Sequence, residues 1–108
     1  MLSLTNAERR KVGCQDLKFN STLAQAAGKH SDDMADRVNA TGYAWSGLAE
    51  NIAAGQQTPQ AAVDRWMNSP PHRRSILNCD YVELGVGVSF GSDGKATPKW
   101  TQNFGIPS

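Results

Sequence analysis

The sequence predicts an α+β sandwich in which helices cover a small antiparallel sheet. Helix start and stop signals dominate the chain up to residue 77. From Tyr81 the period changes to strict alternation, which is typical of a strand with one buried face. A turn-forming Gly-Ser-Asp-Gly segment and a second strand-like segment follow, so the chain ends in a predicted hairpin. Helices first and a hairpin last favour a layered fold.

Length and composition predict one domain over residues 1–108 and exclude several partners. The chain has 39% hydrophobic and 19% charged residues and a net charge of +1, which gives no reason to expect nucleic acid or an anionic membrane. Arg65, Arg73 and Arg74 are interpreted as a solvated face. No apolar run is long enough for a transmembrane segment, and Met1–Leu4 leads directly into a polar helix pattern without a signal peptide. The chain is either cytosolic or the mature part of a secreted protein, and we expect a monomer.

Two helices are predicted in the first third of the chain. The first covers Leu2–Val12 and stops at Gly13, and its run of charges at residues 8–11 indicates a solvent-exposed face. The second begins at Asn20-Ser21, where both residues are good N-caps. His30 falls on its apolar face, where a hydrogen-bonded core histidine is the expected role.

The middle of the chain is predicted to hold a loop, a short strand and two helices. Residues 38–49 are rich in turn formers, and the apolar segment Leu48–Ala54 ends at a glycine. A Thr-Pro pair then opens a helix over Thr58–Asn68, and a Ser-Pro-Pro sequence stops it and starts a short helix over His72–Leu77.

The last two strands are predicted from alternation. Val82, Leu84, Val86, Val88 and Phe90 share one face of the first strand. Its second face carries glycines at 85 and 87, so another element is expected to approach the backbone there. The returning strand contains Trp100, Gln102 and Phe104.

Two cysteines, Cys14 and Cys79, allow one disulfide. A bridge would close a loop of about 65 residues and stabilise the fold by roughly 4 kcal/mol. Two unpaired buried thiols are the alternative. A cysteine nucleophile with His72 as its base is a further alternative, which a disulfide would exclude.

Four polar residues are candidates for chemistry: Glu50, His72, His30 and Glu83. The chain lacks a Gly-rich phosphate loop, His-Glu-x-x-His, Cys-x-x-Cys and Gly-x-Ser-x-Gly. Glu83 alternates with apolar residues and is expected to face solvent. Glu50 lies among apolar neighbours, so it is expected to be buried. A buried carboxylate needs a hydrogen-bonding or charged partner, and His72 is suited to this role. Two groups make a weak metal site, and a third ligand would be His30, Glu83, Asp80 or a group from outside.

These pieces together resemble the CAP superfamily (the SCP domain of cysteine-rich secretory proteins, antigen 5 and pathogenesis-related 1 proteins), and most closely its bacterial secreted branch. The resemblance covers nearly the whole chain and is carried by residues 6–9, 13–14, 23–27, 30–35, 42–43, 49–55, 66–73, 76–78, 84–88 and 100–105. It implies an α-β-α sandwich and a secreted or cell-envelope protein. The resemblance also favours a disulfide between Cys14 and Cys79. It further implies a cleft in which two His and two Glu can hold a divalent metal such as zinc.

Only half of that cleft carries over to this sequence. Glu50 matches the Glu of the Glu-Asn block, and His72 matches the second His. Ser69 occupies the position of the second Glu, and the loop that carries the first His is missing between Ala35 and Asp36. This loop is either deleted or omitted from the sequence.

Three functions follow as hypotheses. The leading one is a non-enzymatic extracellular binding or interaction module, with Glu50 and His72 as a hydrogen-bonded pair in the cleft and no required cofactor. A metal-dependent hydrolase is the rival, with His72 as ligand and Glu50 as general base. The third is a small lipid- or sterol-binding domain with an apolar pocket lined by Trp45, Trp66 and Met67. The expected partners are an extracellular protein or a small apolar ligand.

Overall fold

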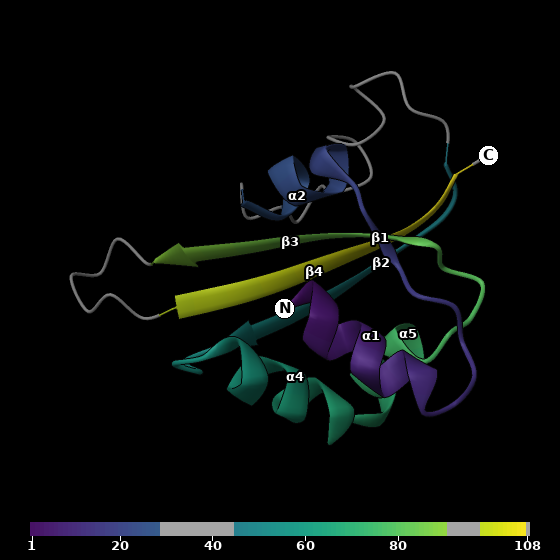
Figure 1. The fold of residues 1–108 in the computed structure, drawn as a ribbon. Coiled ribbons are helices and arrows are strands. Elements are labelled where there is room, and N and C mark those ends of the chain that lie inside the picture. The colour runs from purple at the N-terminus through teal and green to yellow at the C-terminus, as the bar shows by residue number, and fades with distance from the viewer. Residues whose placement is uncertain (29–44, 91–97, 108) are drawn as a thin grey trace.

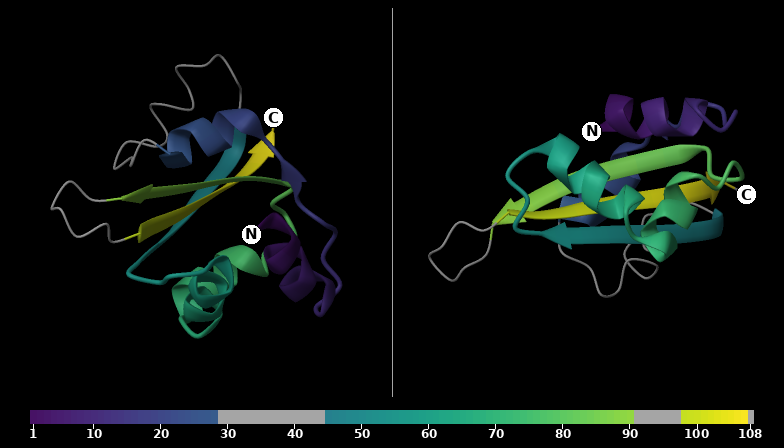
Figure 2. Two further views of the ribbon diagram at one scale, coloured as in Figure 1. Left: turned by 60° about the vertical axis from the view of Figure 1, so that its left-hand side comes forward. Right: turned by 90° about the horizontal axis from the view of Figure 1, so that it is seen from below.

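The computed structural model describes residues 1–28, 45–90 and 98–107, which form three layers. A four-stranded sheet has α2 on one face and the other described helices on the opposite face (Figures 1 and 2). This arrangement confirms the predicted α+β class and the α-β-α sandwich. None of the described helices is long and apolar enough to cross a membrane. The helices are α1 (Leu2–Arg10), α2 (Ser21–Gly28), α4 (Pro59–Met67) and α5 (Pro70–Ile76).

The sheet has the strand order β1-β3-β4-β2 and is mixed rather than purely antiparallel. The central strand β4 runs antiparallel to both β2 and β3, so the predicted hairpin is confirmed. The prediction missed β1, which pairs with β3 in parallel over two residues. A two-residue strand is too short to show alternation. The strands are β1 (Lys18–Phe19), β2 (Trp45–Ala54), β3 (Glu83–Phe90) and β4 (Pro98–Pro107).

The predicted helix signals mark real boundaries to within two residues. Helix α1 ends at Arg10, earlier than expected, because the N–H groups of Val12 and Gly13 turn back to the carbonyls of Arg9 and Arg10. Gly13 then has a φ of +83°, which favours glycine. At the start of α4 the hydroxyl of Thr58 accepts a hydrogen bond from the Ala61 N–H. Helix α5 begins at Pro70 because both prolines fit its first turn.

Gly85 on β3 confirms the predicted close approach of another element. A Cβ atom there would lie 2.1 Å from the backbone nitrogen of Ala24 and 2.2 Å from the carbonyl carbon of Leu23. Helix α2 therefore packs directly on the strand backbone. Its position is fixed by Asn20, whose Oδ1 accepts from the Leu23 N–H and caps the helix.

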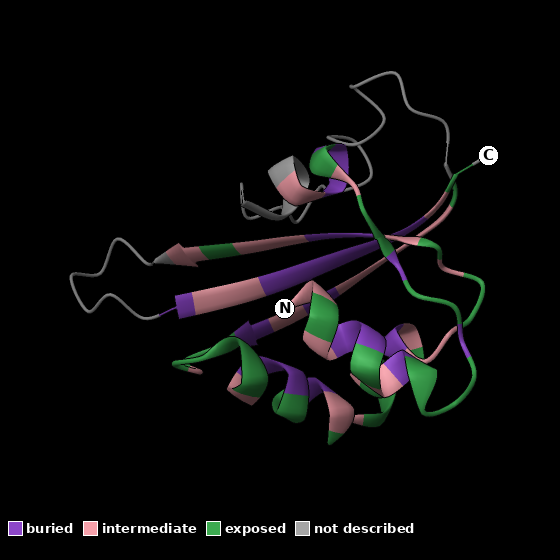
Figure 3. Ribbon diagram, viewed as in Figure 1, coloured by how far each residue is buried: buried purple, intermediate pink, exposed green. Residues whose placement is uncertain are grey.

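The hydrophobic core lies between the sheet and the helices on its α1 side (Figure 3). The alternation in β3 is only partly reflected in burial: Leu84 is fully buried, whereas Val82 and Val88 near the strand ends are 39% and 43% exposed. Burial on this face is therefore greatest at Leu84, near the start of the strand. The buried cluster consists of Leu17, Ala53, Ala62, Val63, Trp66, Ile76, Leu84 and Phe104.

Helix α1 buries a polar stripe against the rest of the protein. Thr5, Asn6 and Arg9 follow one another at helical spacing and are all buried. Asn6 exchanges two hydrogen bonds with the backbone of Leu17. The prediction that the charged run of this helix faces solvent is therefore wrong for Arg9, which is fully buried.

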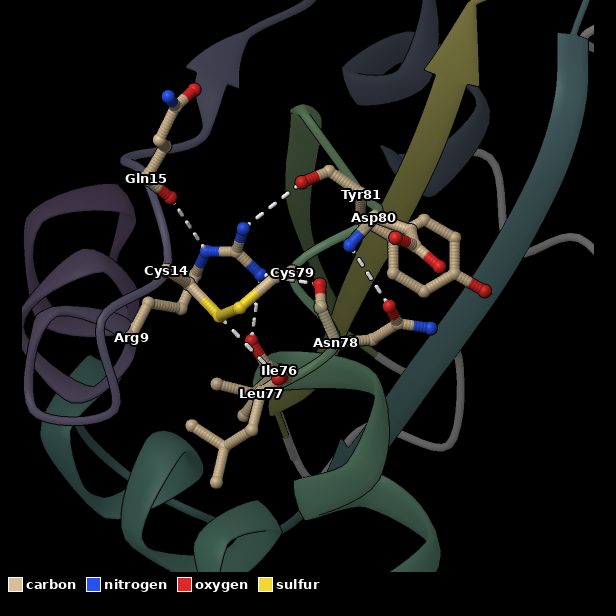
Figure 4. Close-up of a disulfide and its surroundings, with 9 residues drawn as sticks. All are labelled: Arg9, Cys14, Gln15, Ile76, Leu77, Asn78, Cys79, Asp80 and Tyr81. Carbon is tan, nitrogen blue, oxygen red and sulfur yellow. Dashed lines mark hydrogen bonds between the residues drawn. A yellow bond between two sulfur atoms is a disulfide. The ribbon is translucent and has the colours of Figure 1, made fainter.

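Arg9 and the disulfide hold the connection between α5 and β3 (Figure 4). Cys14 and Cys79 form the predicted bridge, with a Cα–Cα distance of 4.9 Å. Beside it, the guanidinium of Arg9 donates four hydrogen bonds of 2.8–3.1 Å to backbone carbonyls, those of Gln15, Ile76, Asn78 and Tyr81. Burial lowers the pKa of Arg9, and nearby Asp16 offsets part of this effect. The guanidinium of an arginine nevertheless stays charged. The buried charge of Arg9 is therefore stabilised chiefly by the dipoles of these carbonyl groups.

Candidate functional site

His72 lies in the first turn of α5, close to the N-cap residue Ser69. It is half-buried, and its Nδ1 lies 3.0 Å from the hydroxyl oxygen of Ser69. Ser69 is the N-cap of α5, yet its side chain makes no capping hydrogen bond to the backbone. Its hydroxyl instead contacts the imidazole, so the position that would carry the second Glu supplies a neutral partner for His72.

Asn51, rather than Glu50, connects His72 to the sheet. The buried Nδ2 of Asn51 donates to the backbone carbonyl of His72 at 3.1 Å and to Oε1 of Gln102 at 3.3 Å. Gln102 in turn donates to the hydroxyl of Thr5 at 2.8 Å. This amide network crosses from α5 through β2 and β4 to α1, and it fixes the start of α5. This role of Asn51 is not among the sequence-based predictions, although a polar residue that faces the core from a strand is a signal for such a network.

Glu50 leaves β2 on the opposite face from Asn51, because successive residues of a strand alternate. Its cross-strand neighbour on β4 is the fully buried Asn103, which donates to the carbonyl of Leu23 in α2. Glu50 is half-buried on this α2 face, and it shares no hydrogen bond or ion pair with His72. Glu50, on the edge strand β2, and His72, in helix α5, therefore belong to opposite faces of the sheet.

The other predicted ligands do not complete a metal site in the part of the chain that the structure describes. Glu83 is half-buried rather than facing solvent, because its carboxylate accepts a 2.6 Å hydrogen bond from Asn20. Asp80 is exposed, and its backbone N–H bonds to the side chain of Asn78. His30 and the Ala35–Asp36 junction lie outside the described residues. No group of three His, Cys, Asp or Glu side chains among the described residues could hold a metal. A zinc ion normally takes at least three protein ligands, so the described residues do not fit one.

Of the three residues predicted to line an apolar pocket, Trp66 is placed elsewhere by the structure. Trp66 is fully buried in the core and cannot line a ligand pocket. The side chain of Trp45 is outside the described part of the structure. Met67 does line a surface hollow, but Asn68, Arg73 and Arg74 line that hollow as well.

Comparison with known proteins identifies the family. The model of the CAP family, described as the cysteine-rich secretory protein family, matches residues 2–104. Two proteins of Bacillus subtilis (strain 168) are similar over 96% of this chain. The uncharacterized protein YkwD is 37% identical and the uncharacterized membrane protein YlbC is 36% identical. The chain spans only 45% of YkwD and 33% of YlbC.

The alignment with YkwD also bears on the missing loop. It extends over 121 positions, more than the 108 residues of this chain, so YkwD has residues within the matched region that this chain lacks. Such a difference is expected if this chain lacks a loop that its relatives have.

Among solved structures, an extracellular protein from Bacillus anthracis str. Ames that contains an SCP domain superposes with a TM-score of 0.83. It is 29% identical, and the match covers 97% of this chain and 38% of that protein. The family match over nearly all residues, the fold and the sequence identity agree, and the chain therefore belongs to the CAP (cysteine-rich secretory protein) family.

Proposed function

We propose that this domain acts outside the cell or in the cell envelope as a non-enzymatic binding module. The Cys14–Cys79 disulfide supports this location, because such bridges persist in oxidising compartments. The similar Bacillus anthracis protein is described as extracellular. A fold alone does not define a reaction, so the proposal depends on the chemistry at the edge of the sheet.

The contact between Ser69 and His72 carries the proposal. A serine hydroxyl offers neither the negative charge of a carboxylate nor a strong metal ligand. Asn51 fixes the backbone of His72 and Ser69 contacts its imidazole, so the ring is held as a hydrogen-bonding group in the first turn of α5. The imidazole would provide polar contacts for a bound protein or small molecule.

Isothermal titration with zinc tests this reading against the metal-dependent hydrolase. We expect no sub-micromolar zinc affinity in the unmodified chain. Ser69→Glu is expected to bind zinc more tightly than the parent, because it places a carboxylate beside His72. Ser3→Glu adds the same charge at an exposed position on α1 and is the matched control. Sub-micromolar affinity that His72→Ala abolishes would reject the metal-free module.

A further inference from the structure

A surface hollow lies between α4 and α5, on the side of α5 that faces away from the core. Its volume is about 440 Å³, within the range of small-ligand sites. Positions 70, 73, 74 and 77 recur at helical spacing, so they share one side of α5 and its C-terminal end. His72 and the buried Ile76 occupy the other side. The residues that line the hollow are Met67, Asn68, Pro70, Arg73, Arg74 and Leu77.

Positive charge at this hollow is not neutralised by any residue that the structure describes. Arg73 and Arg74 are both exposed, and neither forms an ion pair within the described residues. By contrast, Arg10 on α1 is paired with Asp16 and Lys11 is paired with Glu8. Guanidinium groups bind carboxylates through paired, charge-assisted hydrogen bonds. The hollow therefore favours an anion over a neutral ligand.

The remaining lining groups restrict which anion fits. Met67 and Leu77 are half-buried and offer apolar surface. Asn68 donates its Nδ2 to the carbonyl of Asp64 at 2.9 Å, and its Oδ1 has no partner within the described chain. An amide oxygen of this kind accepts from an N–H group. A carboxylate, an apolar group and an N–H donor occur together at the C-terminus of a peptide that ends in an apolar residue.

We propose that the hollow between α4 and α5 binds the C-terminal residue of a peptide or protein partner. Its carboxylate lies against Arg73 and Arg74, its apolar side chain contacts Met67 and Leu77, and its backbone N–H donates to Asn68. This site does not use His72 or Glu50. It therefore goes beyond the function proposed above, and it remains valid if the cleft proposal fails.

NMR titration of the ¹⁵N-labelled chain tests the proposal with two probes, N-acetyl-Ala-Ala-Leu with a free carboxylate and the same peptide with an amidated C-terminus. We expect saturable shifts at the lining residues with a Kd on the order of 1 mM. Amidation is expected to weaken binding about tenfold or more, because it removes the charge-assisted bonds. The double variant Arg73→Ala/Arg74→Ala should lose binding to a similar extent. Both residues are exposed, so the variant should keep the dispersed spectrum of the folded chain.

Arg65→Ala is the matched control, since Arg65 is an exposed arginine on the adjacent helix that does not line the hollow. It should bind the free-acid peptide within about twofold of the parent. His72→Ala should also bind normally, which separates this site from the proposed cleft. Equal binding of the acid and the amide, an equal loss in Arg65→Ala, or unchanged binding in the double variant would overturn the proposal. Retention on vesicles of anionic phospholipid without a response to the peptide would assign the arginines to a membrane surface and overturn it as well.

Discussion

Replacing Arg9 by Met is the sharpest test of how the fold supports α5. Arg9 is fully buried and bonded to four backbone carbonyls, three of them between Ile76 and Tyr81. Methionine has a similar length and suits an apolar site, but it donates no hydrogen bond. The substitution therefore removes the bonds without leaving a large cavity.

The expected loss follows from two opposing contributions. A hydrogen bond from a charged donor contributes about 1.5–3 kcal/mol, and four carbonyls would lose such a donor. The desolvation of the guanidinium, which costs several kcal/mol, disappears at the same time. We expect a net decrease of about 3–5 kcal/mol in the free energy of unfolding. A domain of this size should then melt more than about 10 °C lower.

Urea unfolding followed by circular dichroism, with the disulfide intact, measures this loss. Arg9→Lys keeps the charge but not the planar fork, so its stability should lie between those of the parent and Arg9→Met. Arg10→Met is the control: it removes a neighbouring exposed arginine that pairs with Asp16, and its urea midpoint should change little. If Arg9→Met were no less stable than Arg10→Met, the four-carbonyl contact would not stabilise this fold.

Three further predictions concern other parts of the chain. The double variant Cys14→Ser/Cys79→Ser should lose about 4 kcal/mol in urea unfolding, because the bridge closes a loop of 65 residues, and a loss under about 1 kcal/mol would contradict the chain-entropy argument. Gly85→Ala should lower the free energy of unfolding by about 1–3 kcal/mol, and the melting temperature with it, because its Cβ would meet the backbone of α2. An unchanged melting temperature would argue against this packing. The hydrogen bonds from Arg10 hold the pKa of Asp16 below its ordinary value. The stability from this pair is therefore present above the unfolded pKa and lost as pH falls through the folded one. NMR titration should show Asp16 returning towards its ordinary pKa in Arg10→Met, and an ordinary pKa in the parent would refute the pairing.

Local chemistry made much of the fold predictable from the sequence. The Thr58–Pro59 pair and Gly13 act through their own side-chain and backbone properties, so they mark boundaries wherever the chain goes afterwards. The parallel pairing of β1 and the burial of Arg9 could not be found in this way. Both depend on residues more than sixty positions away, which supply the partner strand and the carbonyls.

The candidate site was less predictable for a related reason. Family resemblance identified Glu50 and His72 as cleft positions, but whether two such residues meet depends on the face of the strand each one uses. The register of β2 on β4 places Asn51 on the side of His72 and Glu50 beside Asn103. Ser69 was identified in the sequence as a substitution, and only the structure shows that its hydroxyl contacts the imidazole.

The short helix α5 therefore presents two chemically different sides, and the same supports fix both. One side holds His72 through Ser69 and Asn51, while the other presents Arg73 and Arg74, which have no ion-pair partner in the described ranges, beside apolar surface. The carbonyl bonds of Arg9 and the disulfide fix the C-terminal end of the helix, so neither side can shift without disturbing the other. A variant that weakens those supports should impair both sites together, whereas variants at the lining residues should separate them. This difference distinguishes an effect on stability from an effect on recognition.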